Sequence, residues 1–402
     1  GSTFSSGGAC AIEESPLEGS FVLALLNSKL GEQLLSFMAA TLNANVGSIR
    51  QLPVPDEINI SNLRNLQLLV ERACSIQEHE WNLNETSPCF DVGLMLPTAR
   101  LNVQVETLSQ QKIEEGISEQ KMLGEVENKI DESISEIYGL PKEIFNRSII
   151  PHDVNHFSTT RSHIIDLISI FIGVLTGRFS LDLPGFVLAN QGESLADYLA
   201  LVPEPSFMPD DDNVVPFTEG QWFEDDVVAR FYEFLKVAFG EEHFSENVRF
   251  IEETLGKDIR KYFLTDFYTD HVKRYKTRPI YWMFSSPQGS FNALIYMHRY
   301  NSSTVGTVLK YVQEFVHKLR SQKEVEDRIA VSATNARDQA QAAKEAAKLQ
   351  KMIVEVSEWE RDVLYPLAQK QIKIDLDDGV KANYPKFGKA LKQIKGLDKN
   401  DD

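Results

Sequence analysis

Two long polar stretches limit what this chain can fold into. Residues 101–138 contain few apolar side chains, mostly at spacings of three or four, which is the period of one helix face. Residues 303–351 repeat the pattern and then become rich in alanine, so they predict an antiparallel helical hairpin. So thin an apolar stripe suits a spacer helix better than a core helix. The stripes are Ile113, Ile117, Val126, Ile130, Ile134 and Ile137 in the first stretch, and Val305, Val308, Val312, Phe315 and Leu319 in the second.

The remaining pattern is also mostly helical, so we expect a mainly α (α+β) fold. The chain has 402 residues, enough for about two or three domains. Composition shifts and Pro-rich or Gly-rich stretches divide it into 1–57, 58–150, 151–216 and 217–402. Further helices are predicted at residues 21–37, 58–80, 161–175, 225–239, 245–255, 259–275 and 354–370.

The composition is typical of a soluble globular protein. Hydrophobic residues make up 42% of the chain and charged residues 25%. No apolar run reaches the roughly 18 residues that a membrane span needs. Cys10, Cys74 and Cys89 have no paired spacing, which fits a reducing compartment. We therefore expect a cytoplasmic protein that does not bind a membrane.

The net charge of −18 argues against attraction of nucleic acid by the whole surface. It does not exclude a local basic groove, because binding depends on where Lys and Arg gather. Residues 257–278 are such a region, where aromatic residues alternate with cations. This run can be a phosphate-binding surface, or an amphipathic helix with aromatic residues in the core and cations in solvent. Its cations are Lys257, Arg260, Lys261, Lys273, Arg274, Lys276 and Arg278.

No motif of a free-standing enzyme is present in the sequence. There is no GxSxG, HExxH, CxxC pair or phosphate-binding GxxxxGK[ST]. His152 and His156 are four residues apart, but no further zinc ligands lie near them. Asp210, Asp211 and Asp212 lack the alternating spacing of a calcium loop, so a solvated turn is the favoured interpretation. We assign no catalytic, cofactor or metal residue.

Several blocks of this chain resemble one family closely. The most specific blocks are an aromatic segment at residues 281–300, with a Ser-Ser-Pro-Gln-Gly turn, and Asp-Leu-Asp-Asp-Gly-Val-Lys-Ala-Asn-Tyr at 375–384. Weaker blocks are Gly-Ser-Ile-Arg-Gln-Leu-Pro-Val-Pro at 47–55 and Leu-Gly-Lys-Asp-Ile-Arg-Lys-Tyr-Phe at 255–263. Together they resemble the C-terminal part of the PglX family, the adenine-specific DNA methyltransferases of BREX phage-defence systems.

The resemblance implies a role for each segment. Residues 1–57 would be the end of a target-recognition domain, 58–150 a helical spacer, 151–216 a connecting region, and 217–402 a C-terminal helical domain. The family's methylation uses S-adenosylmethionine and an Asn-Pro-Pro-Tyr motif, yet no Asn-Pro pair exists in this chain. The resemblance therefore implies a non-catalytic, DNA-recognition or regulatory portion, with no cofactor of its own.

Double-stranded DNA is the partner that the resemblance implies. Arg side chains can bind phosphate or read guanine, and Gln can read adenine. We expect Ala in place of Lys273, Arg274 and Lys276 to weaken DNA binding and its salt dependence. The alternative is a protein-interaction module that docks other BREX subunits or phage proteins. The candidate DNA contacts are Lys273, Arg274, Lys276, Arg278, Ser285, Ser286, Gln288 and Arg299.

Overall fold

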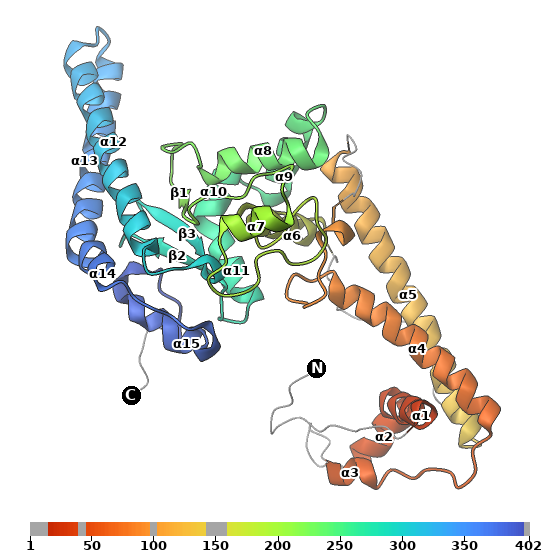
Figure 1. Cartoon of the computed structure of the whole chain (residues 1–402). Helices are drawn as coiled ribbons and strands as arrows, with labels where there is room; N and C mark the ends of the chain where they lie inside the picture. Colours follow the sequence, from red (N-terminus) through yellow and green to blue (C-terminus); the bar gives the residue numbers. More distant parts are fainter. Residues whose placement is uncertain (1–14, 39–45, 97–102, 142–158, 398–402) are drawn as a thin grey trace. The chain divides into compact units, whose positions relative to one another are not determined.

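The computed structural model describes residues 15–38, 46–96, 103–141 and 159–397 (Figure 1). The described part is mainly α-helical with one small sheet, which confirms the expected fold class. The chain divides into two compact units. The first contains residues 1–87 and 110–159, and the second contains 88–109 and 160–402. The division into four segments stays a prediction. Within the described residues, no helix is long and apolar enough to cross a membrane.

The first unit is a small helical assembly built around one apolar cluster. Its helices are α1 (Pro16–Asn27), α2 (Lys29–Met38), α3 (Val46–Arg50), α4 (Ile60–Asn82) and most of α5 (Val105–Ile137). The predicted single helix at 21–37 is two helices, because the chain turns at Ser28. The buried Asp131 carboxylate of α5 accepts the backbone N–H of Lys29, which caps the start of α2.

The long helix α5 buries one face of its apolar stripe in the core of the first unit, and its role as a spacer stays a prediction. Val126, Ile130 and Ile134 are buried with residues of α1 and α4, whereas Ile117 is exposed. The helix stops before Gly139, which has a φ of +65°. The N–H of Leu140 bonds to the carbonyl of Ser135, a closing bond typical of a helix end at glycine.

The second unit is organised around the buried helix α6 (Thr160–Leu175). Phe171 of α6 contacts Phe231, Phe234 and Phe263 at ring-centroid distances of 5.0, 5.4 and 6.1 Å. These aromatic contacts pack α6 against the helices that follow it. The helices and turns around it are η1 (Val92–Leu94), α7 (Leu195–Leu201), α8 (Val227–Phe239), α9 (Phe244–Leu255), α10 (Ile259–Tyr262), the π-helical turn η3 (Phe263–Phe267) and α11 (Tyr268–Arg274).

The aromatic segment at 281–300 forms the centre of a three-stranded antiparallel sheet. The strands are β1 (Val215–Phe217), β2 (Tyr281–Ser285) and β3 (Asn292–Tyr296), in the order β1-β3-β2. The register pairs Trp282 with Ile295, and both are buried. The aromatic side chains of this segment are therefore core residues, and only the turn between β2 and β3 reaches the surface. After β3 follows the short turn η4 (Met297–Arg299).

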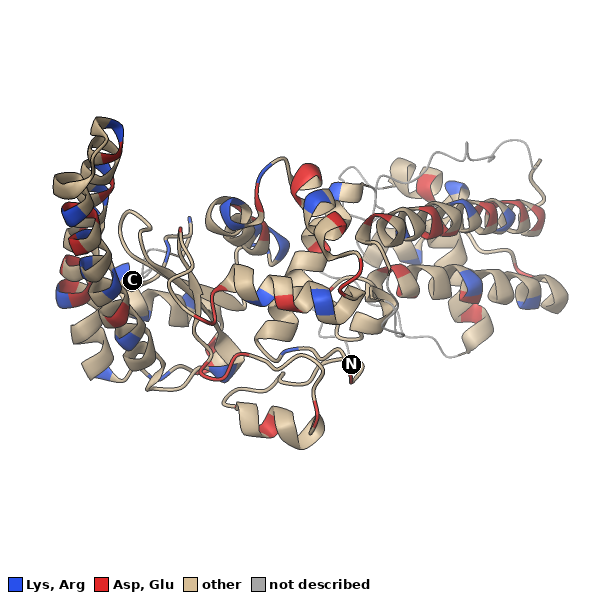
Figure 2. Ribbon diagram, turned by 90° about the horizontal axis from the view of Figure 1, so that it is seen from above, with Lys and Arg blue, Asp and Glu red and all other residues tan. Residues whose placement is uncertain are grey.

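The predicted hairpin is confirmed as α12 (Thr304–Ser332) packed on α13 (Ala336–Trp359) (Figure 1). The separate helix predicted from residue 354 is wrong, because α13 continues to Trp359 and into the π-helical turn η5 (Glu360–Leu364). Short elements complete the chain: α14 (Tyr365–Lys370), η6 (Leu376–Asp378), α15 (Val380–Asn383) and η7 (Tyr384–Ala390). Figure 2 shows acidic and basic residues interspersed along α12 and α13.

Candidate nucleic-acid interface

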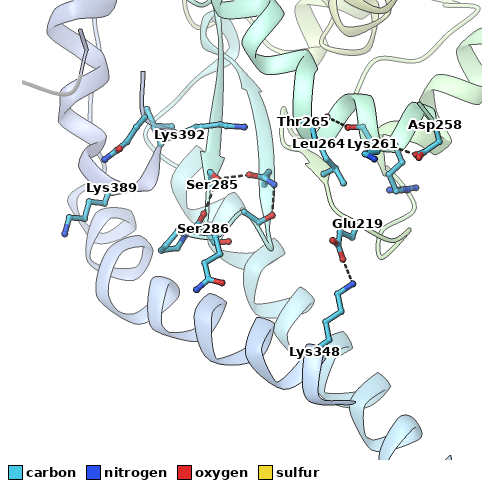
Figure 3. Close-up of a pocket in the computed structure, with 17 residues that line it drawn as sticks. Glu219, Asp258, Lys261, Leu264, Thr265, Ser285, Ser286, Lys348, Lys389 and Lys392 are labelled. Carbon is cyan, nitrogen blue, oxygen red and sulfur yellow. Dashed lines mark hydrogen bonds and ion pairs between the residues drawn. The ribbon is translucent and has the colours of Figure 1, made fainter. Parts of the chain in front are cut away.

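A large groove of about 1080 Å³ opens on the second unit, where five parts of the chain meet. Its walls are the loop after β1, the α10–η3 helix, the β2–β3 turn with α13, and the C-terminal segment (Figure 3). We call it the basic groove. Its lining residues are Glu219, Asp258, Arg260, Lys261, Leu264, Thr265, Ser285, Ser286, Pro287, Gln288, Gly289, Asn292, Lys348, Lys389, Leu391, Lys392 and Gln393.

The basic groove carries positive charge in a chain that is strongly negative. Five of its lining side chains are cationic and two are acidic, a net charge of +3 against −18 for the whole chain. Arg260 is held in a two-pronged ion pair with the buried Asp226, both contacts being 2.8 Å. Lys348 bonds to Glu219 at 2.5 Å. Lys348 and Glu219 are about half exposed, so solvent weakens their attraction.

Three cations of the basic groove are available for a ligand. Among the described residues, no acid pairs with Lys261, Lys389 or Lys392. Figure 3 shows Lys389 and Lys392 on one side of Ser285 and Ser286, and Lys261 on the other. Burial lowers the pKa of Lys392, whose ammonium nitrogen lies 5.8 Å from the centroid of the Tyr268 ring. Cations spread around polar hydroxyl and amide groups suit a polyanion.

The β2–β3 turn forms one rim of the basic groove. The N–H of Gly289 bonds to the carbonyl of Ser286 at 2.9 Å, with Pro287 and Gln288 in the middle of the turn. Proline at the second position and glycine at the fourth are the residues that such a turn favours. Asn292 of β3 donates to the carbonyl of Gly289 at 3.0 Å. These hydrogen bonds close the turn that the Ser-Ser-Pro-Gln-Gly sequence predicts.

The C-terminal segment reaches the basic groove by adding to the edge of β2. Leu391 forms an isolated antiparallel bridge with Phe284, and the N–H of Lys392 bonds to the carbonyl of Met283 at 2.8 Å. Leu391 itself is buried, and the neighbouring Lys389, Lys392 and Gln393 line the groove.

The structure divides the predicted DNA contacts into three groups. Ser285, Ser286 and Gln288 line the basic groove. Lys273, Lys276 and Arg278 are exposed at the end of α11 and do not line it. Arg274 and Arg299 point into the protein.

Arg274 and Arg299 have structural partners. Arg274 makes an ion pair with Asp166 of α6, whose side chain is only 5% exposed. Arg299 is buried and donates to three backbone carbonyls, those of Thr176, Asp210 and Asp211. A guanidinium with this many internal acceptors holds the loop together, so neither arginine enters the set of contacts that we propose below.

Sequence reasoning missed four lysines of the basic groove as a group. Lys261 belongs to the basic run, whereas Lys348 comes from α13 and Lys389 and Lys392 from the C-terminal segment. The sequence showed only a small excess of lysine in that last segment.

The Asp210–Asp212 loop is more than a solvated turn. Asp210 is buried, and one oxygen from each of the three carboxylates lies within 4.8 Å of the others. Burial, followed by the nearby Asp212 carboxylate, raises the pKa of Asp210 to about 7, and the Arg299 guanidinium opposes the rise. Burial likewise raises the pKa of Asp212 to about 6. His152 and His156, to which no metal site was assigned, lie outside the described residues.

The raised pKa of Asp210 predicts how stability changes with pH. The folded-state pKa of about 7 exceeds the ordinary value of 3.8, so the folded chain binds this proton more tightly. The contribution of protonated Asp210 to the free energy of unfolding is complete below about pH 4 and is lost as the pH rises through about 7. We expect Asp210→Asn to be more stable than wild type at about pH 8, with a smaller difference at about pH 5.

Urea denaturation at both pH values measures this effect. Glu204→Gln, at an exposed loop residue, is the control and should change stability little at either pH. An equal effect of Asp210→Asn at both pH values would contradict the assignment.

Comparison with known proteins places the whole chain beside one group of enzymes. No family model matches it. The adenine-specific methyltransferase BrxX of Escherichia coli O9:H4 (strain HS) is 33% identical over 438 aligned residues, which cover 100% of this chain and 35% of BrxX. The adenine-specific methyltransferase PglX of Lacticaseibacillus casei (strain Zhang) is 30% identical over 397 residues, 91% of this chain and 31% of PglX. The chain thus spans about a third of the curated relatives it matches.

Proposed function

We propose that this chain, a homologue of about a third of the BrxX and PglX adenine-specific methyltransferases, holds duplex DNA in the basic groove. The observation that carries the proposal is a net charge of +3 concentrated in one large groove of a chain with a net charge of −18. Local cations neutralise phosphates and release counterions, whatever the total charge of the protein. Lys261, Lys389 and Lys392 would contact the phosphate backbone.

The groove suits a stacked duplex better than unstacked bases. Proteins that bind single strands use aromatic side chains on which the bases stack. None of the residues that line the basic groove is aromatic, because the rings of β2 and β3 are buried in the core. Hydroxyl and amide groups at Ser285, Gln288 and Gln393 accompany the lysines instead. Such groups contact phosphates and base edges.

As part of this proposal, the chain serves as the DNA-holding portion of a longer adenine-specific methyltransferase. The complete protein would methylate adenine-N6 in host DNA with S-adenosylmethionine and so mark it for BREX phage defence. Methylation of a paired base requires the base to leave the duplex. A recognition portion that grips the backbone would hold the DNA during that step, while the chemistry takes place in a part outside this chain.

Binding of fluorescent duplexes across a salt series tests the proposal. Each neutralised phosphate contributes about −0.9 to the slope of log K against log salt. With three lysines that have no acid partner among the described residues, and Lys348 as a fourth, we expect a slope between roughly −2.7 and −3.6. No binding at about 50 mM salt, or binding without a salt slope, would contradict the proposal.

A second candidate function is protein docking by the α12–α13 hairpin. Between Leu319 and Ala342 no residue is buried, so the end of the hairpin makes no contact with the core of its unit. An exposed helical hairpin is a surface on which another BREX protein or a phage inhibitor could pack. Retention of a partner by this chain, and its loss when residues 320–341 are replaced by a short loop, would favour this function.

A further inference from the structure

The rim of the basic groove is held in place by a residue outside the groove. In a four-residue turn closed between Ser286 and Gly289, the N–H of the third residue has no acceptor inside the turn. In this chain that residue is Gln288. Its N–H donates to the Oε1 atom of Glu355 on α13 at 2.7 Å. This charge-assisted hydrogen bond therefore fastens the turn to the helical hairpin.

The other oxygen of Glu355 makes this contact unusual. Glu355 Oε2 is buried and has no hydrogen-bond partner among the described residues. A buried carboxylate oxygen without a partner costs free energy, so Glu355 is a poor choice for stability alone. A buried carboxylate that lacks a hydrogen-bond partner at one oxygen calls for an explanation other than stability. Here the explanation is that Glu355 fixes the geometry of the β2–β3 turn.

The rest of the turn is already fixed by its own residues. Ser286 Oγ accepts the N–H of Phe291 at 3.1 Å, and the hydroxyl of Ser285 donates to Asn292 Oδ1 at 2.7 Å. The side chain of Gln288, in contrast, is exposed and lines the basic groove, and none of its described neighbours bonds to it. A fixed backbone with one open carboxamide is suited to contact a base edge, where glutamine bonds to adenine through two hydrogen bonds.

We infer that Glu355 is a positioning residue for sequence recognition, because it aims the carboxamide of Gln288 at a base edge while the lysines hold the backbone. This inference rests on the proposed DNA-binding function and adds that different residues determine affinity and sequence discrimination. Lys261, Lys389 and Lys392 set affinity and its salt dependence. Gln288, oriented through Glu355, sets discrimination between sequences.

Selection from a pool of randomised duplexes tests this assignment of roles. The wild-type chain and the variants Gln288→Ala, Glu355→Ala and Glu355→Gln are each mixed with the pool, and the bound duplexes are sequenced. Wild type should enrich a short motif that contains adenine. Gln288→Ala and Glu355→Ala should lose at least about tenfold of the enrichment at that adenine, the order of one good contact. Glu355→Gln should retain it, because its amide oxygen can still accept the N–H of Gln288.

A purely structural role of Glu355 gives a different pattern. It would lower the midpoint of urea denaturation and change affinity for all sequences equally, without flattening the motif. Binding with a salt slope but no enriched motif in wild type, or a motif unchanged in Glu355→Ala, would overturn the inference and leave the proposed groove intact. Absence of any salt-dependent DNA binding would instead overturn the proposed function itself.

Discussion

Replacing Lys261, Lys389 and Lys392 together with Ala is expected to lower the affinity for duplex DNA by roughly two to three orders of magnitude near 100 mM salt. Each lysine that neutralises a phosphate contributes about 0.9 to the magnitude of the salt slope, so the slope should fall by about 2.7. The three side chains line the basic groove and have no acid partner among the described residues. Removing them should therefore cost affinity with little loss of stability.

Two control variants make the result specific. Lys310, Lys344 and Lys370 are exposed and do not line the groove, so their replacement with Ala removes the same charge without the same effect. Ala at Lys273, Lys276 and Arg278 tests the exposed end of α11 separately. If either control set loses more affinity for duplex DNA than the groove set does, the DNA interface lies outside the groove.

Phe387→Ala is expected to be the most destabilising single substitution that we propose. Phe387 is 1% exposed, and its ring lies 5.5 Å from that of Trp282, 6.0 Å from Phe284 and 5.6 Å from Tyr300. Removing a buried phenylalanine ring costs about 3–5 kcal/mol. Since this ring anchors the C-terminal segment on β2, the variant should also lose DNA affinity by displacing Lys389 and Lys392.

Urea denaturation followed by tryptophan fluorescence measures the stability of Phe387→Ala. Tyr365→Ala is the matched control, because Tyr365 is 51% exposed and its loss should cost less than about 0.5 kcal/mol. If Phe387→Ala is no less stable than Tyr365→Ala, the C-terminal segment is not anchored as described. If Phe387→Ala is destabilised but binds DNA like wild type in the absence of urea, the C-terminal segment does not supply the cations of the groove.

The sequence predicted the long helices well because their signals are local. The apolar stripe of α12 and the Gly139 stop of α5 depend on residues within a few positions of one another. The N-cap of α4 is equally local, because the side chain of Asn59 accepts the N–H of Ser61. The predicted helix boundaries were less accurate where tertiary contacts determine them. Ser28 separates α1 from α2, and α13 continues past residue 354.

The candidate site shows the same limit. The turn from Ser285 to Gly289 was predicted from its residues, because turn chemistry is local. The basic groove was not predicted, because its lysines come from positions 261, 348, 389 and 392 and meet only through folding. Arg299 shows the converse. Beside an aromatic segment it was a candidate DNA contact, yet three backbone carbonyls from distant residues bond to it inside the fold.

Photo-crosslinking from inside the basic groove tests most directly whether duplex DNA lies there. A photoreactive phenylalanine analogue at Gln393, an exposed residue of the groove, would be compared with the same group at Leu201, which is 56% exposed and does not line the groove. We predict crosslinks to a labelled duplex from position 393 that disappear at high salt, and none from position 201. Salt-dependent binding with no crosslink from position 393 would contradict DNA binding in the basic groove.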